Sequence, residues 1–377
     1  MKIRRKDLAD KKEVTKEWNE KGNPFSDQNK FPEPRGCCDA TLKIDRECAE
    51  AWHKRGFSLG KLGRYVEALK SLDKALMINP EYSAPWCSRG YALVKLGRYD
   101  DAVASYDKAL KIDPDLSDAW NNRGTALDEL GRHEEALASY DKALEINPDY
   151  STAWYNRGCD LDELGQLADA VASYDKALKI KPDYPAAWFG RGFALEELGR
   201  HEEALASYDI ALIIDPDDFA AWHNRGNALR TLDRYTEAIA SYDKALKIKP
   251  DYSAAWFSRG FVLEELSQHE EAVVSYDKAL RINQEDSTAW YNRGIALAEL
   301  GRYDDAIASY DKALKINPDH SAAWNNRGNA LGNVGLYSEA IASYDKALTF
   351  DPDNVEAHNN REQVRINLNN KKPASPH

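Results

Sequence analysis

Small and apolar positions along the chain follow a pattern that recurs every 34 residues without insertion or deletion. We number the positions of each repeat as slots 1 to 34, with slot 1 at residues 49, 83, 117, 151, 185, 219, 253, 287 and 321. Slots 4, 8, 11 and 14 have helical spacing, as do slots 17, 20, 21, 24, 27 and 28. The pattern therefore predicts two amphipathic helices in every repeat.

Turn residues separate the predicted helices. A Gly-Arg pair at slots 15 and 16, such as Gly131-Arg132, divides the two helices of a repeat, and a Pro-Asp corner ends the second helix. Proline occupies slot 32 in all full repeats except one, which has Gln284. Serine at slot 1 of six repeats is expected to cap the first helix, because its hydroxyl can accept a hydrogen bond from an unpaired amide.

Five slots carry a family signature. Trp at slot 4, Gly at slot 8, Ala at slots 20 and 27 and Pro at slot 32 resemble the tetratricopeptide repeat, over residues 49–354. Such tandem units bury their apolar surface only against their neighbours. The resemblance implies an all-α, right-handed superhelical solenoid of antiparallel helix pairs. It also implies a concave groove lined by the first helices, chiefly by slots 2, 5, 6, 9, 12 and 13.

The repeat frame divides the chain into five parts. Residues 49–354 form nine tandem repeats. Residues 15–48 keep the frame with Trp18 at slot 4, Gly22 at slot 8 and Asp39 at slot 25, and are interpreted as a degenerate N-terminal cap. Residues 355–372 are predicted to form a C-terminal capping helix. Residues 1–14 are expected to be a flexible charged tail, and residues 373–377 a disordered one.

Charge and composition restrict the partners. A net charge of −12 argues against binding to nucleic acids or anionic membranes and favours a basic, partly apolar protein or peptide. No stretch has the apolar length of a signal peptide or a membrane span. Five cysteines without a paired motif suit a reducing compartment, so the cytoplasm is the expected location.

Two opposite charges recur in all nine full repeats, Arg at slot 7 and Asp at slot 25. They can pair within a repeat or between neighbours. Arg361, in the terminal helix, has no later Asp in its own repeat, which favours pairing between neighbours. We therefore predict the partly buried ion pairs Asp345–Arg361 and Asp107–Arg123, whose disruption would cost about 3–5 kcal/mol if buried. The alternative is an arginine stripe that binds a ligand.

Slot 6 holds a column of asparagines. Because an amide both donates and accepts, such a column can bind the backbone of an extended peptide. It is similar to the asparagine ladder of O-linked N-acetylglucosamine transferases; alternatively, Asn is merely a common exposed residue here. The candidate residues are Asn122, Asn156, Asn224, Asn292 and Asn326.

Aromatic and acidic residues complete the predicted groove. Aromatic residues at slots 5 and 9 share a helix face and are interpreted as groove wall, with core packing as the alternative. They include Tyr155, Phe189, Phe193, Phe257, Phe261 and Tyr291. Acidic pairs at slots 12 and 13 would attract a basic segment, or else pair locally with slot 16, as Asp128 with Arg132. They are Asp128, Glu129, Asp162, Glu163, Glu196, Glu197, Glu264 and Glu265.

The sequence offers no catalytic motif. His133, His201 and His269 share slot 17 but lack the second histidine of a zinc-protease helix, and are interpreted as packing residues near a turn. No enzyme activity, cofactor or metal is therefore predicted. The favoured function is a protein interaction scaffold that binds a partner segment in its concave groove. The alternatives are a self-associating structural solenoid and a recruiting subunit of a separately encoded enzyme.

Overall fold

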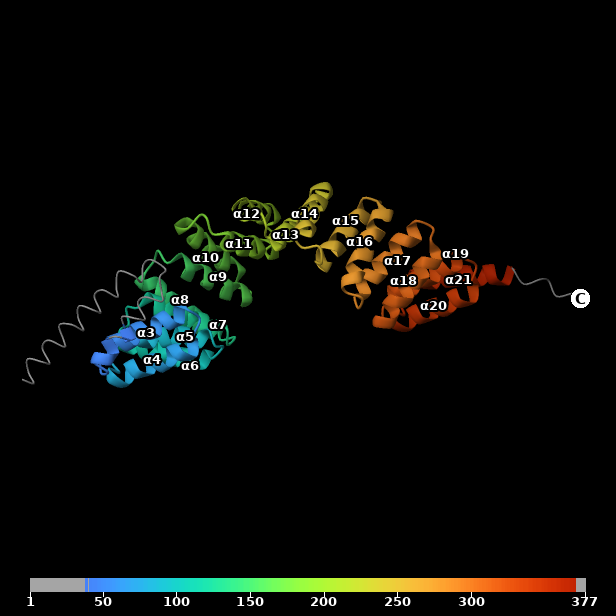
Figure 1. The fold of residues 1–377 in the computed structure, drawn as a ribbon. Coiled ribbons are helices and arrows are strands. Elements are labelled where there is room, and N and C mark those ends of the chain that lie inside the picture. Colours follow the sequence, from blue (N-terminus) through green and yellow to red (C-terminus); the bar gives the residue numbers. More distant parts are fainter. Residues whose placement is uncertain (1–37, 40, 371–377) are drawn as a thin grey trace, which may run out of the picture. The chain divides into compact units, whose positions relative to one another are not determined.

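The computed structural model describes residues 38, 39 and 41–370. The predicted tail 1–14 and most of the degenerate repeat 15–48 lie outside these residues, as do positions 371–377. The chain comprises two compact units, Met1–Ala194 and Leu195–His377. In the described part of both units, regular secondary structure is entirely helical (Figure 1).

The helices follow the repeat frame. The first unit contains α3 (Ala49–Lys61), α4 (Tyr65–Ile78), α5 (Ser83–Val94), α6 (Tyr99–Ile112), α7 (Ser117–Asp128), α8 (His133–Ile146), α9 (Ser151–Glu163) and α10 (Leu167–Ile180). Helix α11 (Pro185–Glu197) spans the boundary between the units. The second unit contains α12 (His201–Ile214), α13 (Phe219–Thr231), α14 (Tyr235–Ile248), α15 (Ser253–Glu265), α16 (His269–Ile282), α17 (Ser287–Glu299), α18 (Tyr303–Ile316), α19 (Ser321–Asn333), α20 (Tyr337–Phe350) and α21 (Val355–Asn370).

Within each unit, the first helix of a repeat packs against the second helix of the same repeat, which in turn packs against the first helix of the next. The terminal helix α21 packs against α19 and α20. This arrangement confirms the predicted all-α solenoid of tandem helix pairs. Each repeat completes its core with side chains from its neighbours, as expected for a repeat protein.

The glycine at slot 8 makes room for a large buried ring. A Cβ atom added at Gly90 would lie 2.7 Å from Cε1 of Tyr106, which occupies slot 24 of the same repeat. Tyrosines at slot 24 are at most 1% exposed and are the largest fully buried side chains, whereas the tryptophans at slot 4 are half-buried. The core is therefore centred on these tyrosines and not on the tryptophans.

Helix capping differs from the prediction. Serine at slot 1 is the first residue of its helix, and the N-cap is the residue before it, at slot 34. Asp218 and Asp286, both at slot 34, accept hydrogen bonds from amides of the first turns of α13 and α17. The prediction of a serine cap was thus wrong by one residue.

Arginine at slot 7 connects two consecutive repeats through an ion pair and a hydrogen bond. Nε of Arg123, in α7, lies 2.7 Å from Oδ1 of Asp107, in the second helix of the preceding repeat. Its Nη1 donates to Oγ of Ser139, in the second helix of its own repeat, at 2.6 Å. Ser139 then donates to the carbonyl of Glu135. We call this Asp–Arg–Ser arrangement the arginine clamp.

The clamp recurs along the chain. Arg–Asp pairs at 2.6–2.9 Å link slots 7 and 25 of neighbouring repeats throughout the described residues, from Asp39–Arg55 to Asp345–Arg361. The arginine side chains are 17–27% exposed, but the aspartates are 41–54% exposed. The carboxylates therefore keep much of their hydration. The cost of about 3–5 kcal/mol predicted for disrupting one buried pair is too high for these partly exposed pairs.

Tryptophan at slot 4 supports the clamp. The Arg123 guanidinium lies 5.8 Å from the centre of the Trp120 ring, within cation–π range. The Trp120 indole N–H donates to the carbonyl of Pro114 at the preceding corner, at 2.8 Å. In the repeat without proline, Trp290 donates to the Gln284 carbonyl in the same way. The corner therefore contributes a carbonyl oxygen, which explains why glutamine is tolerated there.

We expect Arg123→Lys to lower the free energy of unfolding by about 1–2 kcal/mol, because an ammonium group cannot reproduce the two fixed bonds to Asp107 and Ser139. Urea unfolding of the full chain measures this change. The control is Arg132→Lys, which alters an exposed pair with Glu135 and should leave the unfolding midpoint unchanged. Equal effects of the two substitutions would contradict the clamp.

The turn between the helices provides a second test. Glycine at slot 15 has a positive φ, such as +70° at Gly301, but Ser267 adopts φ 57° at the same slot. Because a left-handed conformation costs a non-glycine residue about 1 kcal/mol, Ser267→Gly should stabilise the chain by roughly 0.5–1 kcal/mol. The reverse change, Gly301→Ser, should destabilise it. Thermal unfolding of both variants checks the opposite signs, and shifts in the same direction would refute this explanation.

Candidate binding surface

A pocket of about 410 Å³ lies on the first helices of the second unit. It brings together slots 2, 5, 6, 9 and 12 of successive repeats, which are slots that the resemblance assigns to the groove. Its wall includes the predicted residues Phe257, Phe261, Tyr291 and Asn292. The remaining lining residues, which the sequence interpretation did not include, are Arg230, Ser258, Thr288 and His320.

The pocket wall is mainly aromatic and carries one guanidinium. Phe257 packs against the buried ring of Tyr276, and Tyr291 packs against Tyr310 and His320. The Arg230 guanidinium lies 5.5 Å from the centre of the Phe261 ring. Arg230 is the only basic residue at slot 12 in the nine full repeats. A neutral apolar group fits this pocket better than a cation.

The slot-12 acids next to Arg230 are turned inward. Tyr208 donates to Oε2 of Glu196 at 3.0 Å, and Tyr276 makes a short hydrogen bond to Glu264. Burial raises the pKa of Glu196, and it raises the pKa of Glu264 to about 7. These carboxyl groups therefore contribute less negative charge to the surface than the sequence suggested. Asp162, at the same slot in the fourth repeat, is half-buried.

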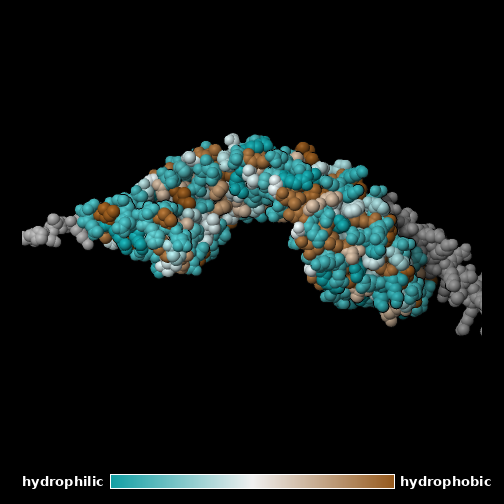
Figure 2. Space-filling view, turned by 180° about the vertical axis from the view of Figure 1, so that it is seen from behind, coloured by the Kyte–Doolittle hydropathy of each residue, from teal (hydrophilic) through white to brown (hydrophobic). Residues whose placement is uncertain are grey.

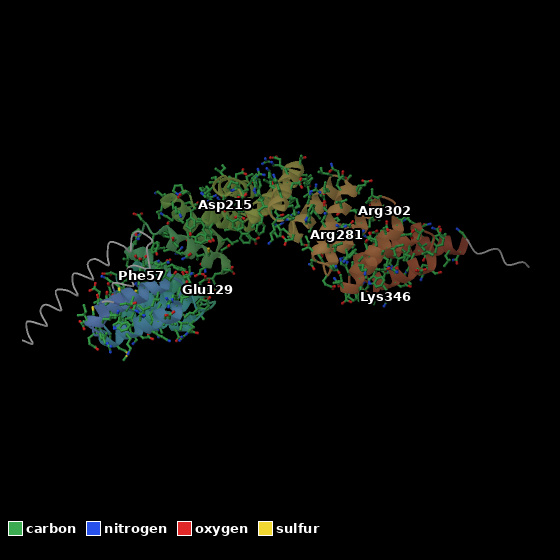
Figure 3. All side chains as sticks on the ribbon, viewed as in Figure 1. Phe57, Glu129, Asp215, Arg281, Arg302 and Lys346 are labelled. Atoms are coloured by element: carbon green, nitrogen blue, oxygen red, sulfur yellow. The ribbon has the colours of Figure 1, made fainter. Side chains whose placement is uncertain are left out.

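The slot-13 acids remain exposed. They are Glu129, Glu163, Glu197 and Glu265. Glu129, labelled in Figure 3, accepts a hydrogen bond from the Tyr99 hydroxyl of the preceding repeat, which raises the pKa of Tyr99. The alternative of local pairing with slot 16 is wrong for Asp128, because Arg132 pairs with Glu135 at 2.7 Å.

The asparagine column lies at the contacts between neighbouring first helices. Nδ2 of Asn156 donates to Oδ1 of Asn121 at 3.1 Å, and Nδ2 of Asn326 donates to the Tyr291 hydroxyl at 3.2 Å. Asn292 is buried, and Asn122 and Asn224 are half-buried. A structural role between repeats therefore accounts for part of this column. Backbone capture of a peptide stays a prediction.

The other predicted aromatic residues lie in the first unit. Tyr155 is half-buried and packs against Tyr174 and Tyr184. Phe189 is also half-buried, whereas Phe193 is 41% exposed. The two slot-5 residues are thus partly packed, whereas Phe193 at slot 9 is exposed. Whether an aromatic residue at slot 5 or 9 belongs to the groove wall or to the core therefore depends on its packing in the individual repeat.

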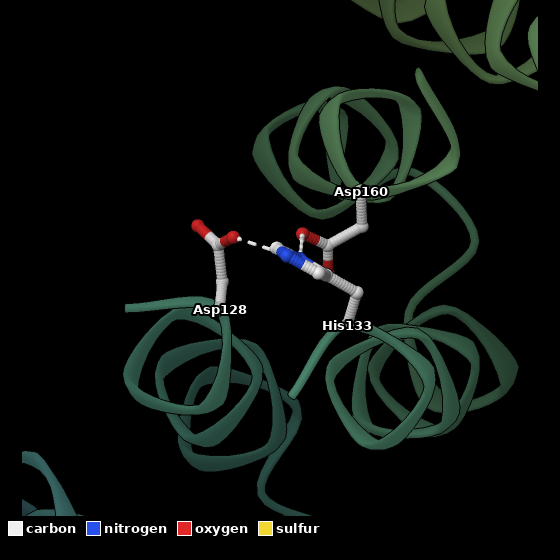
Figure 4. Close-up of side chains that lie close together, drawn as sticks. All are labelled: Asp128, His133 and Asp160. Atoms are coloured by element: carbon white, nitrogen blue, oxygen red, sulfur yellow. Dashed lines mark hydrogen bonds and ion pairs between the residues drawn. The ribbon is translucent and has the colours of Figure 1, made fainter. Parts of the chain in front are cut away.

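A second cluster lies between the third and fourth repeats. Nδ1 of His133 is 3.3 Å from Oδ1 of Asp128 and 3.2 Å from Oδ1 of Asp160 (Figure 4). Asp160 is 1% exposed, and burial raises its pKa to about 7. A hydrogen bond to Asp160 raises the pKa of His133. His133 is thus hydrogen-bonded across the boundary between two repeats in addition to lying next to a turn.

The surface between such sites is mostly polar. Hydrophobic residues on the face seen in Figure 2 form small patches separated by hydrophilic ones. Within residues 38, 39 and 41–370, no helix has both the length and the apolarity needed to cross a bilayer.

Family comparisons decide the class of repeat. Three models described as tetratricopeptide repeats match the chain, one at residues 87–151 and 155–219, another at 49–82, 287–320 and 321–354, and a third at 226–267 and 265–301. The chain belongs to the tetratricopeptide repeat family. These matches cover most of the tetratricopeptide array predicted at residues 49–354. No curated protein matches the chain.

Several solved structures are similar. YrrB, described as having an unusual peptide-binding site, is 26% identical, with a TM-score of 0.47 over 51% of this chain and 99% of its own. PilF of Pseudomonas aeruginosa is 19% identical, with a TM-score of 0.49 over 56% of this chain and 97% of its own. A tetratricopeptide protein from Parabacteroides merdae is 19% identical, with a TM-score of 0.48 over 66% and 98%.

A buried histidine next to the pocket makes stability depend on pH. His223 bonds to the hydroxyls of Tyr252 and Ser258, each at 3.3 Å, and burial lowers its pKa to about 4. Because the folded-state pKa is below the unfolded value of about 6.5, this histidine contributes stability above pH 6.5 that is lost as the pH falls toward 4.

We expect His223→Asn to reduce this pH dependence, since Asn121 is buried at the same slot in the third repeat. When the pH falls from 7 to 5, His223 should lower the free energy of unfolding of the wild type by about 1–2 kcal/mol. The variant should not show this loss. Urea unfolding at both pH values measures the difference. His269→Asn is the control, at a slot outside the first helices. Parallel losses in the His223 variant and wild type would contradict this assignment.

Proposed function

We propose that this chain is a non-catalytic scaffold of the cytoplasm that binds a segment of another protein through the face of its first helices. The observation that supports this proposal is the pocket at Phe257, Phe261 and Tyr291, to which three successive repeats contribute. Aromatic pockets of this kind bind the apolar anchor residues that provide most of the affinity of a peptide.

The charges around the pocket suggest how the segment is arranged. Arg230 beside Phe261 disfavours a cation inside the pocket, so the anchor is a neutral aromatic or aliphatic side chain. Basic residues of the segment would lie outside the pocket, near exposed acids such as Glu265. The partner is thus a basic, partly apolar segment with a neutral anchor.

The experiment is a selection of random peptides by phage display on the full chain, followed by fluorescence anisotropy with an enriched peptide. Phe261→Ala should weaken binding about 10–100-fold, because a buried aromatic side chain contributes roughly 1.5–3 kcal/mol. Phe193→Ala is the matched control, since Phe189 and Phe193 repeat the Phe-x-x-x-Phe motif outside the pocket. It should change the affinity less than twofold.

Two outcomes would contradict the proposal. One is the failure of the full chain to enrich any peptide, and the other is equal affinity of the Phe261→Ala variant and wild type. Light scattering on the same samples tests the self-associating alternative. A chain that stays monomeric as its concentration rises excludes end-to-end stacking, whereas growing assemblies would favour the structural solenoid.

A further inference from the structure

The cluster of Asp128, His133 and Asp160 has the composition of a metal site. Asp128 ends α7, His133 begins α8, and Asp160 lies in α9 of the next repeat. One ligand atom from each side chain lies within 4.8 Å of the other two. Figure 4 shows the His133 ring between the two carboxylates. The three residues therefore come from three helices and converge on one small volume.

Asp160 is the exceptional residue. Slot 10 holds alanine in most repeats, and Ala126, Ala228 and Ala296 are at most 2% exposed there. A carboxylate at this buried slot loses its hydration, which is costly unless a partner compensates for it. Oδ1 of Asp160 has His133, but its Oδ2 is buried without a hydrogen-bond partner. The protein alone therefore compensates this carboxylate only in part.

The distances fit a tetrahedral ion. With metal–ligand bonds of 2.0–2.1 Å, the edge of a tetrahedron is about 3.3 Å. The two separations from Nδ1 of His133, 3.2 Å to Asp160 and 3.3 Å to Asp128, match this edge. A single N–H group cannot point at both oxygens, so a hydrogen bond satisfies only one of them. A central ion would satisfy both.

The donor set selects the kind of ion. One imidazole nitrogen and two carboxylate oxygens suit a first-row divalent ion, whereas Ca²⁺ takes six to eight oxygen ligands. Two carboxylates beside a neutral imidazole carry a charge of −2, which a divalent cation neutralises. Asp128 is 41% exposed, so water can reach the fourth position from that side.

We propose that Asp128, His133 and Asp160 bind one divalent first-row transition ion, with Zn²⁺ as the best fit. The ion links α7 and α8 of the third repeat to α9 of the fourth. Binding releases a proton, because the imidazole nitrogen and both carboxylates must be deprotonated to act as ligands.

Other repeats provide internal controls. His201 and His269 occupy the same slot as His133, and each follows an acid at slot 12, Glu196 or Glu264. The next repeat, however, has Ala228 or Ala296 where Asp160 would lie. Nδ1 of both histidines is buried without a hydrogen-bond partner. These repeats therefore lack the buried carboxylate and should not bind the ion.

The test is isothermal titration of ZnCl2 into the untagged full chain after treatment with EDTA, together with thermal unfolding at pH 7.5. We expect one ion per chain and a higher unfolding temperature. Asp160→Ala introduces alanine, the usual residue at slot 10, so the metal-free variant should stay folded. This variant should bind the ion about a hundredfold more weakly. His269→Ala should bind like the wild type.

Three results would overturn the proposal. The first is wild-type chain that neither binds Zn²⁺ nor gains stability from it, which would mean that the carboxylates share a proton instead. The second is equal binding by Asp160→Ala and wild type. The third is loss of binding in His269→Ala, which would place the ion in another repeat.

Discussion

The arginine at slot 7 is the constraint on which the array depends. Its planar guanidinium holds donors in fixed directions, and each direction is occupied by a group from a different helix. Asp107 belongs to the repeat before Arg123, and Ser139 to the repeat that contains it. The guanidinium thus fixes the register between consecutive repeats. Trp120 and the Pro114 carbonyl in turn limit where the guanidinium can lie.

A fixed register allows function to arise from single substitutions. Because every first helix is held in the same relation to its neighbours, the residues at slots 5, 6, 9 and 12 can differ between repeats while the arginine clamp keeps the register. Arg230 at slot 12 changes the charge of one aromatic pocket, and Asp160 at slot 10 places a carboxylate where alanine is usual. Both candidate sites depend on the repeating framework and on one departure from it.

Periodicity was sufficient to predict the helices and their pairing, because amphipathic spacing and turn residues act locally. The register of the ion pairs could also be deduced, since Arg361 has a partner only in the preceding repeat. The role of Ser139 could not, because a neutral hydroxyl carries no charge that would mark Arg123 as its partner. Slot 23 is serine in every full repeat, and that invariance was the available signal.

The sites themselves were harder to predict. Whether Asn156 bonds to Asn121 or to a ligand depends on side-chain distances across two helices, which slot numbers do not give. Asp160 departs from the repeat consensus and could have been noticed as a charge at an apolar slot. Its position next to His133 depends on how the fourth repeat packs on the third.

The coupling of consecutive repeats through one guanidinium can be measured with a double-mutant cycle of Asp107→Asn and Ser139→Ala. Both residues bond to Arg123, so loss of one partner should change the contribution of the other. The account predicts a coupling free energy of about 0.5–1 kcal/mol in urea unfolding of the full chain. Strictly additive effects would contradict it.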